Sequence, residues 1–153
     1  MDKGQKLARY ERICGQLAGL LGRTADTQAR MATVTALLYH KFDHYFWCGF
    51  YRLVDRDLVV GPYQGPLACQ VLARGRGVCW AAVTGGETVI VPDVRRFAGH
   101  IACDARSLSE IVVPVRDAGG AIVAVLDVAG DKPEQFDEED RQGLETIVAL
   151  LTR

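Results

Sequence analysis

The segment SEIVVPVRDAGGAIVAVLDV, residues 109–128, decides the fold, because it reads as two apolar strands joined by a tight turn. The strands are residues 110–116 and 121–128, and the turn holds Gly119 and Gly120, which can adopt the positive φ that such turns require. Strands joined by a tight turn are antiparallel, so this segment predicts an antiparallel hairpin.

Two carboxylates interrupt the apolar pattern of this hairpin. Asp127 lies within the second strand, and Glu110 stands at the start of the first. A carboxylate in an apolar strand costs free energy unless it has a partner or faces a pocket. We therefore expect Asp127 to face a pocket or a partner, and we interpret Glu110 as a strand-end acid in contact with water.

An earlier hairpin is predicted from residues 45–53 and 58–61, and the breaker-rich segment 61–66 is expected to be a loop. Strand periodicity divides its first strand into two faces, one with Tyr45, Trp47, Gly49, Tyr51 and Leu53 and the other with Phe46, Cys48, Phe50 and Arg52. The two aromatic rings that flank the glycine are either part of the core or the wall of a pocket, with room above the glycine for a small ligand.

Helical periodicity predicts helices over residues 5–22 and 26–42, a short helix over 77–84, and a final helix capped by Asp137. This order predicts an α+β fold, in which a central antiparallel sheet of five or six strands carries the N- and C-terminal helices together on one face. The length predicts a single domain that spans residues 1–153.

Composition argues against several classes of function. The formal net charge is −1 and the basic residues are scattered, so nothing indicates a nucleic-acid partner. No apolar run is long enough to cross a membrane, and the first residues lack the apolar core of a signal peptide. We therefore expect a cytoplasmic protein with no membrane or nucleic-acid partner.

The five cysteines are an odd number, and a reducing compartment disfavours a disulfide framework, which leaves core packing, metal binding or redox chemistry. Free cysteine is commonly a buried hydrophobe, but Cys103 lies between His100 and Asp104, in a polar setting typical of reactive thiols. Cys79 falls in the first turn of the short helix, where the helix N-terminus favours a thiolate. A zinc scaffold of Cys69, Cys79, His100 and Cys103 has looser spacing than structural zinc sites, so no metal is expected.

A set of short motifs runs through the chain from about residue 5 to residue 150. They are WCGFY (47–51), GPYQG (61–65) followed by Cys69, GRGVC (75–79), GHIACD (99–104), SEIVVP (109–114), LD (126–127) and FDEED (136–140). With these motifs the chain resembles the free methionine-R-sulfoxide reductases, single-domain enzymes of the GAF fold. Each motif alone is weak, whereas three cysteines in matching contexts and in order are specific.

The resemblance implies reduction of free L-methionine-(R)-S-oxide to L-methionine. The implied cycle passes through a cysteine sulfenic acid and a disulfide, is recycled by thioredoxin, and needs no cofactor. Cys103 matches the cysteine that attacks the sulfoxide, Cys69 matches the resolving cysteine, and Cys79 matches a third cysteine that sometimes takes part in the disulfide. The resemblance also suggests a homodimer.

The substrate pocket is implied in the same way. Trp47 and Tyr51 match the aromatic wall around the substrate methyl group, and Glu110 and Asp127 match the acids that bind the amine and polarise the sulfoxide. Backbone N–H groups from Ala102 to Asp104 are expected to bind the substrate carboxylate.

The chain departs from the family pattern at three places. Ala129 replaces a second acid, and Pro66-Leu67 replaces a lysine-containing step. Trp80 stands where glycine is preferred, and we expect its indole to narrow or reshape the pocket. The alternative reading of the sequence is a non-catalytic GAF module that binds a small ligand as a sensor.

Overall fold

In the computed structural model, which describes residues 1–100 and 103–153, one antiparallel sheet has the strand order β3-β2-β1-β6-β5-β4. Its strands are β1 (Trp47–Val54), β2 (Asp57–Gln64), β3 (Val71–Leu72), β4 (Val89–Val91), β5 (Ser109–Arg116) and β6 (Ile122–Gly130). The predicted hairpin of β5 and β6 is confirmed and forms the middle of the sheet together with β1.

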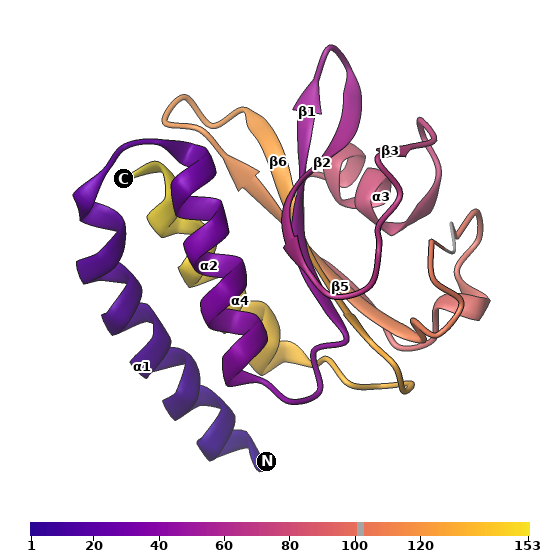
Figure 1. The fold of residues 1–153 in the computed structure, drawn as a ribbon. Helices are drawn as coiled ribbons and strands as arrows, with labels where there is room; N and C mark the ends of the chain where they lie inside the picture. Colours follow the sequence, from indigo (N-terminus) through magenta and orange to yellow (C-terminus); the bar gives the residue numbers. More distant parts are fainter. Residues whose placement is uncertain (101–102) are drawn as a thin grey trace.

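Three long helices cover one face of the sheet and one short helix covers the other (Figure 1). The long helices are α1 (Lys3–Leu20), α2 (Thr27–Lys41) and α4 (Glu138–Ala149), and the short helix is α3 (Gly77–Gly85). Single 3-10 turns lie at η1 (Leu21–Arg23), η2 (Val94–Arg96) and η3 (Leu150–Thr152). The prediction that the terminal helices share one face is confirmed.

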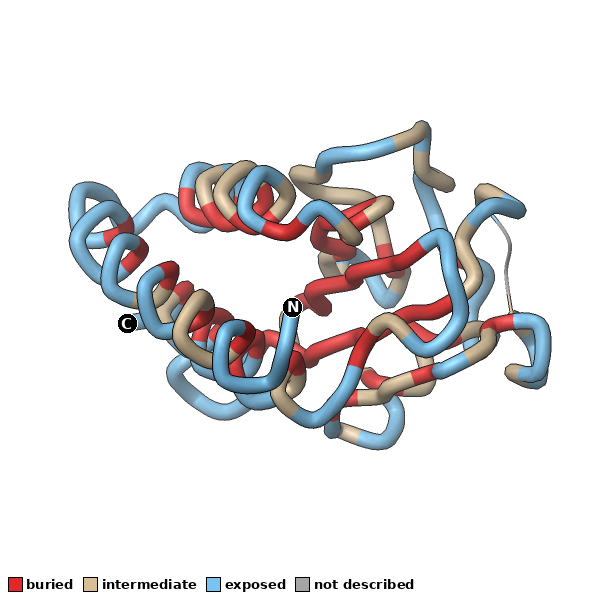
Figure 2. The backbone as a smooth tube through the Cα atoms, turned by 90° about the horizontal axis from the view of Figure 1, so that it is seen from below, coloured by how far each residue is buried: buried red, intermediate tan, exposed pale blue. Residues whose placement is uncertain are grey.

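The sheet separates two apolar cores, because alternate residues of each central strand point to opposite faces. Cys48 and Phe50 of β1 pack in the core under the long helices, whereas Trp47 and Tyr51 pack in the core that contains α3. Figure 2 shows the central strands as largely buried, with the outer sides of the helices exposed. No described helix is long and apolar enough to cross a membrane.

The predicted faces are wrong for the two residues that precede β1. Tyr45 stacks on Phe42 with ring centroids 4.7 Å apart, in the core under the long helices. Phe46 packs against the other core. The strand begins only at Trp47, so its alternation does not extend back to these two rings.

Strand β2 is longer than predicted and includes residues 61–64 of the segment 61–66 that was expected to be a loop. Between the pairs Tyr51–Val60 and Gly49–Tyr63, the two residues Gly61 and Pro62 face one residue of β1. This bulge explains how the strand accommodates a proline, because a bulged residue need not donate to the ladder.

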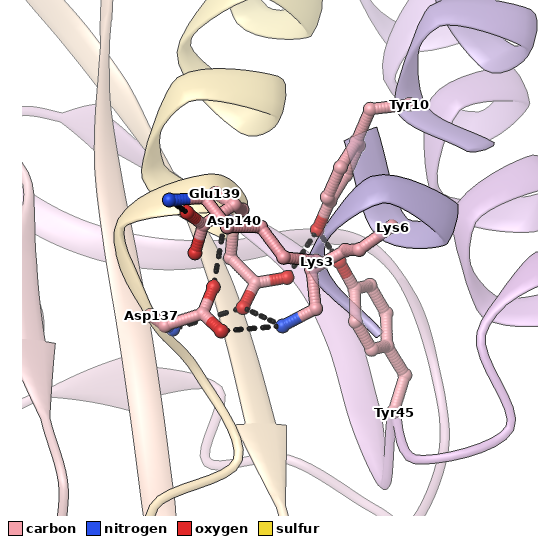
Figure 3. Close-up of polar contacts among 7 residues, drawn as sticks. All are labelled: Lys3, Lys6, Tyr10, Tyr45, Asp137, Glu139 and Asp140. Atoms are coloured by element: carbon pink, nitrogen blue, oxygen red, sulfur yellow. Dashed lines mark hydrogen bonds and ion pairs between the residues drawn. The ribbon is translucent and has the colours of Figure 1, made fainter. Parts of the chain in front are cut away.

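A polar cluster that is buried except at Asp137 joins α1 to the start of α4 (Figure 3). Lys6 Nζ donates to Asp137 at 2.9 Å and to Asp140 at 2.8 Å. The Tyr10 hydroxyl donates to Asp140 at 2.7 Å and lies 2.6 Å from the Tyr45 hydroxyl. Asp137 also caps α4 as predicted, since its side chain accepts from the Asp140 N–H. We call these five residues the α1–α4 cluster.

Candidate functional site

A pocket opens on the α3 face of the sheet. Its walls come from β1, β5, β6, the start of α3 and the two segments 67–72 and 100–107. The cavity measures about 70 Å³. One water needs roughly 10–15 Å³ of such space, so the cavity holds about five waters and suits a single small molecule.

Strand register brings the predicted acids and the indole to this pocket. Trp47 of β1 pairs with Ala129 of β6, and Ala129 pairs with Glu110 of β5, which places three side chains in one row across the sheet. Asp127 lies two residues earlier on β6, on the same face. All four residues line the pocket.

Glu110 is not a strand-end acid in water, and that interpretation is wrong. Its exposed fraction is 8%, the same as that of Asp127. β5 begins one residue before Glu110, and its neighbour β6 covers it from the side, so the carboxyl group faces the pocket interior. The prediction that Asp127 faces a pocket is confirmed.

The aromatic wall is a stack of three rings, and it leaves no room above Gly49. The Trp47 ring lies 5.8 Å from Tyr51 and 5.3 Å from Tyr63, in stacked arrangements. A Cβ at Gly49 would overlap Tyr63 and the Trp47 ring, so the expected space for a ligand above this glycine is filled by the indole. The ligand space lies beside the rings instead.

The same two aromatic residues hold the segment that carries Cys69. Trp47 Nε1 donates to the Pro66 carbonyl at 3.1 Å, and the Tyr51 hydroxyl donates to the Cys69 carbonyl at 3.0 Å. Cys69 is bonded to Cys103 as a disulfide, with their Cα atoms 5.5 Å apart. Cys103 lines the pocket and is exposed. Two sulfurs 34 residues apart in sequence therefore meet at the pocket wall.

Cys79 is not a thiolate, and this expectation is wrong. Its exposed fraction is 4%, and its Sγ donates to Asp127 Oδ2 at 3.5 Å. Burial raises the pKa of this thiol well above its usual value, and the charges of Asp127 and Glu110 raise it further. Desolvation and two nearby carboxylates outweigh the helix N-terminus.

Glu110, Asp127 and Cys79 form what we call the acid cluster, in which one polar atom from each lies within 4.8 Å of the others. Burial raises the pKa of Glu110 well above its usual range, and the neighbouring Asp127 raises it further. Burial also raises the pKa of Asp127, but hydrogen bonds from Glu110 and Cys79 oppose this effect. Burial therefore raises the pKa of both carboxyl groups, and it raises that of Glu110 further above its usual range.

The remaining predicted ligand positions fall in the segment around Cys103. Ala102 lies outside the described residues. Asp104 lines the pocket, but its carboxylate bonds to the Arg106 guanidinium at 2.7 Å, which holds the pKa of Asp104 at about 2. The side chain of Asp104 therefore already has an internal cation as its partner.

Arg76 is a pocket residue that the sequence analysis missed. It precedes α3 at the N-cap position and lines the pocket, and it forms no ion pair with any residue that the structure describes. Its flanking glycines gave no sign of this role, because the pattern around Gly75 and Gly77 is not that of a phosphate loop. Trp80 is the opposite case: it is absent from the described pocket lining, and its Nε1 lies 3.5 Å from the Leu72 carbonyl.

The zinc set considered from the sequence does not assemble in this form of the protein. Cys69 and Cys103 are bonded to each other, so neither offers a thiolate. Among the described residues, the acid cluster is the group with metal-ligating atoms close together.

Comparisons with known proteins agree with this architecture. The profile of the GAF domain family matches residues 24–153. "GAF domain-containing protein A" of Dictyostelium discoideum is 47% identical over 99% of this chain and 95% of its own length. A free methionine-R-sulfoxide reductase of Escherichia coli is 45% identical over 82% of this chain and 75% of its own length. The structure of the free methionine-R-sulfoxide reductase from Neisseria meningitidis in complex with its substrate has a TM-score of 0.91 and 39% identity, and covers 99% of this chain and 89% of that one.

Proposed function

The chain belongs to the free methionine-R-sulfoxide reductase family of GAF domains, and on that premise we propose that it is an oxidoreductase that reduces free L-methionine-(R)-S-oxide. The observation that carries the proposal is the bond between Cys69 and Cys103 at a pocket that also contains two buried acids. A sulfoxide reductase that uses thiols needs this combination of a sulfur pair and a proton donor. A homodimer and a cytoplasmic location stay predictions.

The proposed cycle begins with reduced Cys69 and Cys103. The Cys103 thiolate attacks the sulfoxide sulfur, the sulfoxide oxygen passes to Cys103 as a sulfenic acid, and methionine leaves with its sulfur reduced by two electrons. The Cys69 thiol then condenses with the sulfenic acid, which forms the disulfide and releases water. The dithiol of thioredoxin reduces this disulfide by exchange and becomes a disulfide itself.

The acid cluster supplies the proton that this attack requires. A sulfoxide sulfur is a poor electrophile until its oxygen is protonated or hydrogen-bonded. Burial and the neighbouring Asp127 raise the pKa of Glu110 well above its usual range, which favours the protonated form and makes Glu110 the proposed donor to the sulfoxide oxygen. Asp127 stays the more acidic partner and binds the substrate ammonium group.

The chemistry of the pocket favours a free amino acid. Asp127 offers an anion for the ammonium group, and Arg76 on the wall offers a cation for the carboxylate. Backbone N–H groups near Cys103 are a second candidate for the carboxylate. A methionine within a polypeptide lacks both charges and so cannot use these two groups.

The direct test incubates the protein with each epimer of free methionine sulfoxide and with dithiothreitol or thioredoxin, and measures methionine. We expect turnover of the R epimer, none after Cys103→Ser, and unchanged turnover after the matched control Cys14→Ser in α1. Absence of R turnover at high enzyme concentration contradicts the proposal. Binding of the R epimer without turnover favours the sensory module instead.

The role of Cys69 has its own test. Cys69→Ser should complete one turnover and then fail to be recycled by thioredoxin, because no partner is left to close the disulfide. If this variant recycles as well as the parent, the resolving cysteine is Cys79.

A further inference from the structure

We propose that the acid cluster binds a thiophilic divalent cation of the Zn²⁺ class. The cation takes the place that the substrate ammonium group occupies in the proposed function. The binding is independent of that function, and only the inhibition that follows from it rests on the proposed function.

The donor set suits such a cation. Cys79, Glu110 and Asp127 come from α3, β5 and β6, and their ligand atoms lie within 4.8 Å of one another. Zn–S and Zn–O distances of about 2.3 and about 2.0 Å at a tetrahedral angle separate the two ligand atoms by about 3.5 Å. Cys79 Sγ and Asp127 Oδ2 are 3.5 Å apart.

A second observation points to a ligand that brings positive charge. Asp127 Oδ1 is buried and has no hydrogen-bond partner within the described structure. No described lysine, arginine or histidine forms an ion pair with Glu110 or Asp127. The missing charge can come from a proton on Glu110, from an ammonium group or from a metal ion, and only the metal ion also uses the thiol.

The chemistry of the donors selects the kind of cation. A thiolate with carboxylate oxygens suits zinc, whereas Mg²⁺ and Ca²⁺ prefer oxygen ligands alone. On binding, the S–H bond of Cys79 is replaced by an S–Zn bond, any O–H bond of Glu110 is replaced by an O–Zn bond, and the displaced protons leave to solvent. Three protein ligands leave the fourth position open towards the pocket, where water completes the tetrahedron.

The consequence is inhibition that competes with substrate. A cation bound to Asp127 neutralises the carboxylate that the substrate ammonium group needs. The Zn²⁺-loaded protein should therefore show a raised KM for the R-sulfoxide, and addition of a chelator should restore the original KM.

The binding test uses chelator-treated protein in its oxidised form, because the disulfide removes Cys69 and Cys103 as competing thiols. Titration calorimetry should detect one Zn²⁺ per chain and no comparable binding of Mg²⁺. Asp127→Asn, which preserves shape, and Cys79→Ala should each weaken Zn²⁺ binding at least tenfold. The control Cys14→Ser should bind Zn²⁺ like the parent. Thermal melts of each variant verify that it is folded.

A spectroscopic measurement provides a second readout. Co²⁺ in place of Zn²⁺ should show the absorption of a tetrahedral site with one sulfur ligand, and this absorption should disappear in Cys79→Ala. Zn²⁺ binding that survives Asp127→Asn, that depends on His100 instead, or that is absent from the parent overturns the inference. A protein that binds one Zn²⁺ at this cluster but reduces no sulfoxide keeps this inference and refutes the proposed function.

Discussion

The protein contains two close pairs of carboxyl groups in contrasting surroundings: Asp137 is exposed beside the buried Asp140, whereas Glu110 and Asp127 are both buried. In the α1–α4 cluster, Asp137 and Asp140 share the Lys6 ammonium group at 2.9 and 2.8 Å, and Tyr10 also donates to Asp140. In the acid cluster, Glu110 and Asp127 have no cation among the described residues, and the Cys79 thiol is a weak donor. The negative charge of the first cluster is thus compensated by a lysine, whereas that of the second has no positive partner among the described residues.

This difference in charge compensation indicates that the α1–α4 cluster stabilises the fold and that the acid cluster is suited to bind a ligand. Burial raises the pKa of Asp137, but the bonds to Lys6 outweigh it and hold that pKa at about 2. Burial raises the pKa of Glu110 and the adjacent Asp127 raises it further, so there the protein has no offsetting charge. A buried carboxylate without a cation lowers the stability of the fold. A protein retains such a carboxylate where a ligand supplies the missing positive charge.

The largest expected effect is on activity in the acid cluster. Asp127→Asn and Glu110→Gln should each lower kcat/KM for the R-sulfoxide by about 100-fold or more, the range of general acid catalysis. Neither change should lower the melting temperature, because each removes a buried carboxyl group that lacks a cation. The exposed control Glu11→Gln should match the parent in both measurements. A clear fall in melting temperature in either variant would contradict the contrast between the two clusters, because it would show that the acid cluster also stabilises the fold.

The reverse pattern is expected for Asp140→Asn in the α1–α4 cluster. Lys6 and Tyr10 donate to different oxygens of Asp140, and the amide replaces one of these oxygens with an NH2 group that cannot accept. The free energy of unfolding, measured by denaturant titration, should fall by about 3 kcal/mol. KM should not change. The matched control is the neighbouring Glu139→Gln, whose partner Lys3 is 75% exposed, and its cost should stay below about 1 kcal/mol.

The two clusters should also give opposite dependence of stability on pH. Glu110 has a folded pKa above its ordinary value of 4.5, so its contribution is full below pH 4.5 and is lost as pH rises towards the folded pKa. Asp137 has a folded pKa of about 2 against an ordinary 3.8, so its contribution is present above pH 3.8 and is lost as pH falls through 2.

Two variants distinguish the contributions of Glu110 and Asp137 to the dependence of stability on pH. Glu110→Gln should gain stability relative to the parent as pH rises above 4.5, and Asp137→Asn, which keeps a good N-cap, should flatten the acid side of the curve. Unfolding free energies between pH 2 and pH 8 measure both. Parallel curves for the parent and Glu110→Gln would show that Glu110 is not held protonated by burial.

The smallest effect is expected at Trp80, which lies next to the acid cluster in sequence but outside the described pocket lining. Trp80→Phe should change KM for the R-sulfoxide less than twofold. A larger change would place the indole in the pocket and restore the idea that it reshapes the site.

Local pattern predicted most elements but not their surroundings. The β5–β6 hairpin, the helix periods and the Asp137 cap follow from residues close together in sequence, and the structure confirms them. The buried state of Glu110 does not, because it depends on the register between β5 and β6. Cys79 was misjudged for the same reason, since the helix N-terminus is local and the two carboxylates are not.

The amino-acid sequence by itself determined the elements, their order and the cysteines and acids available for chemistry, because periodicity and turn residues act over a few positions. Only the tertiary structure decided which charges are compensated. Lys6 reaches Asp140 across 134 residues, whereas Glu110 and Asp127 meet across the sheet with no cation between them. Electrostatic partnership depends on distance in space and on burial, and neither can be read from a linear pattern.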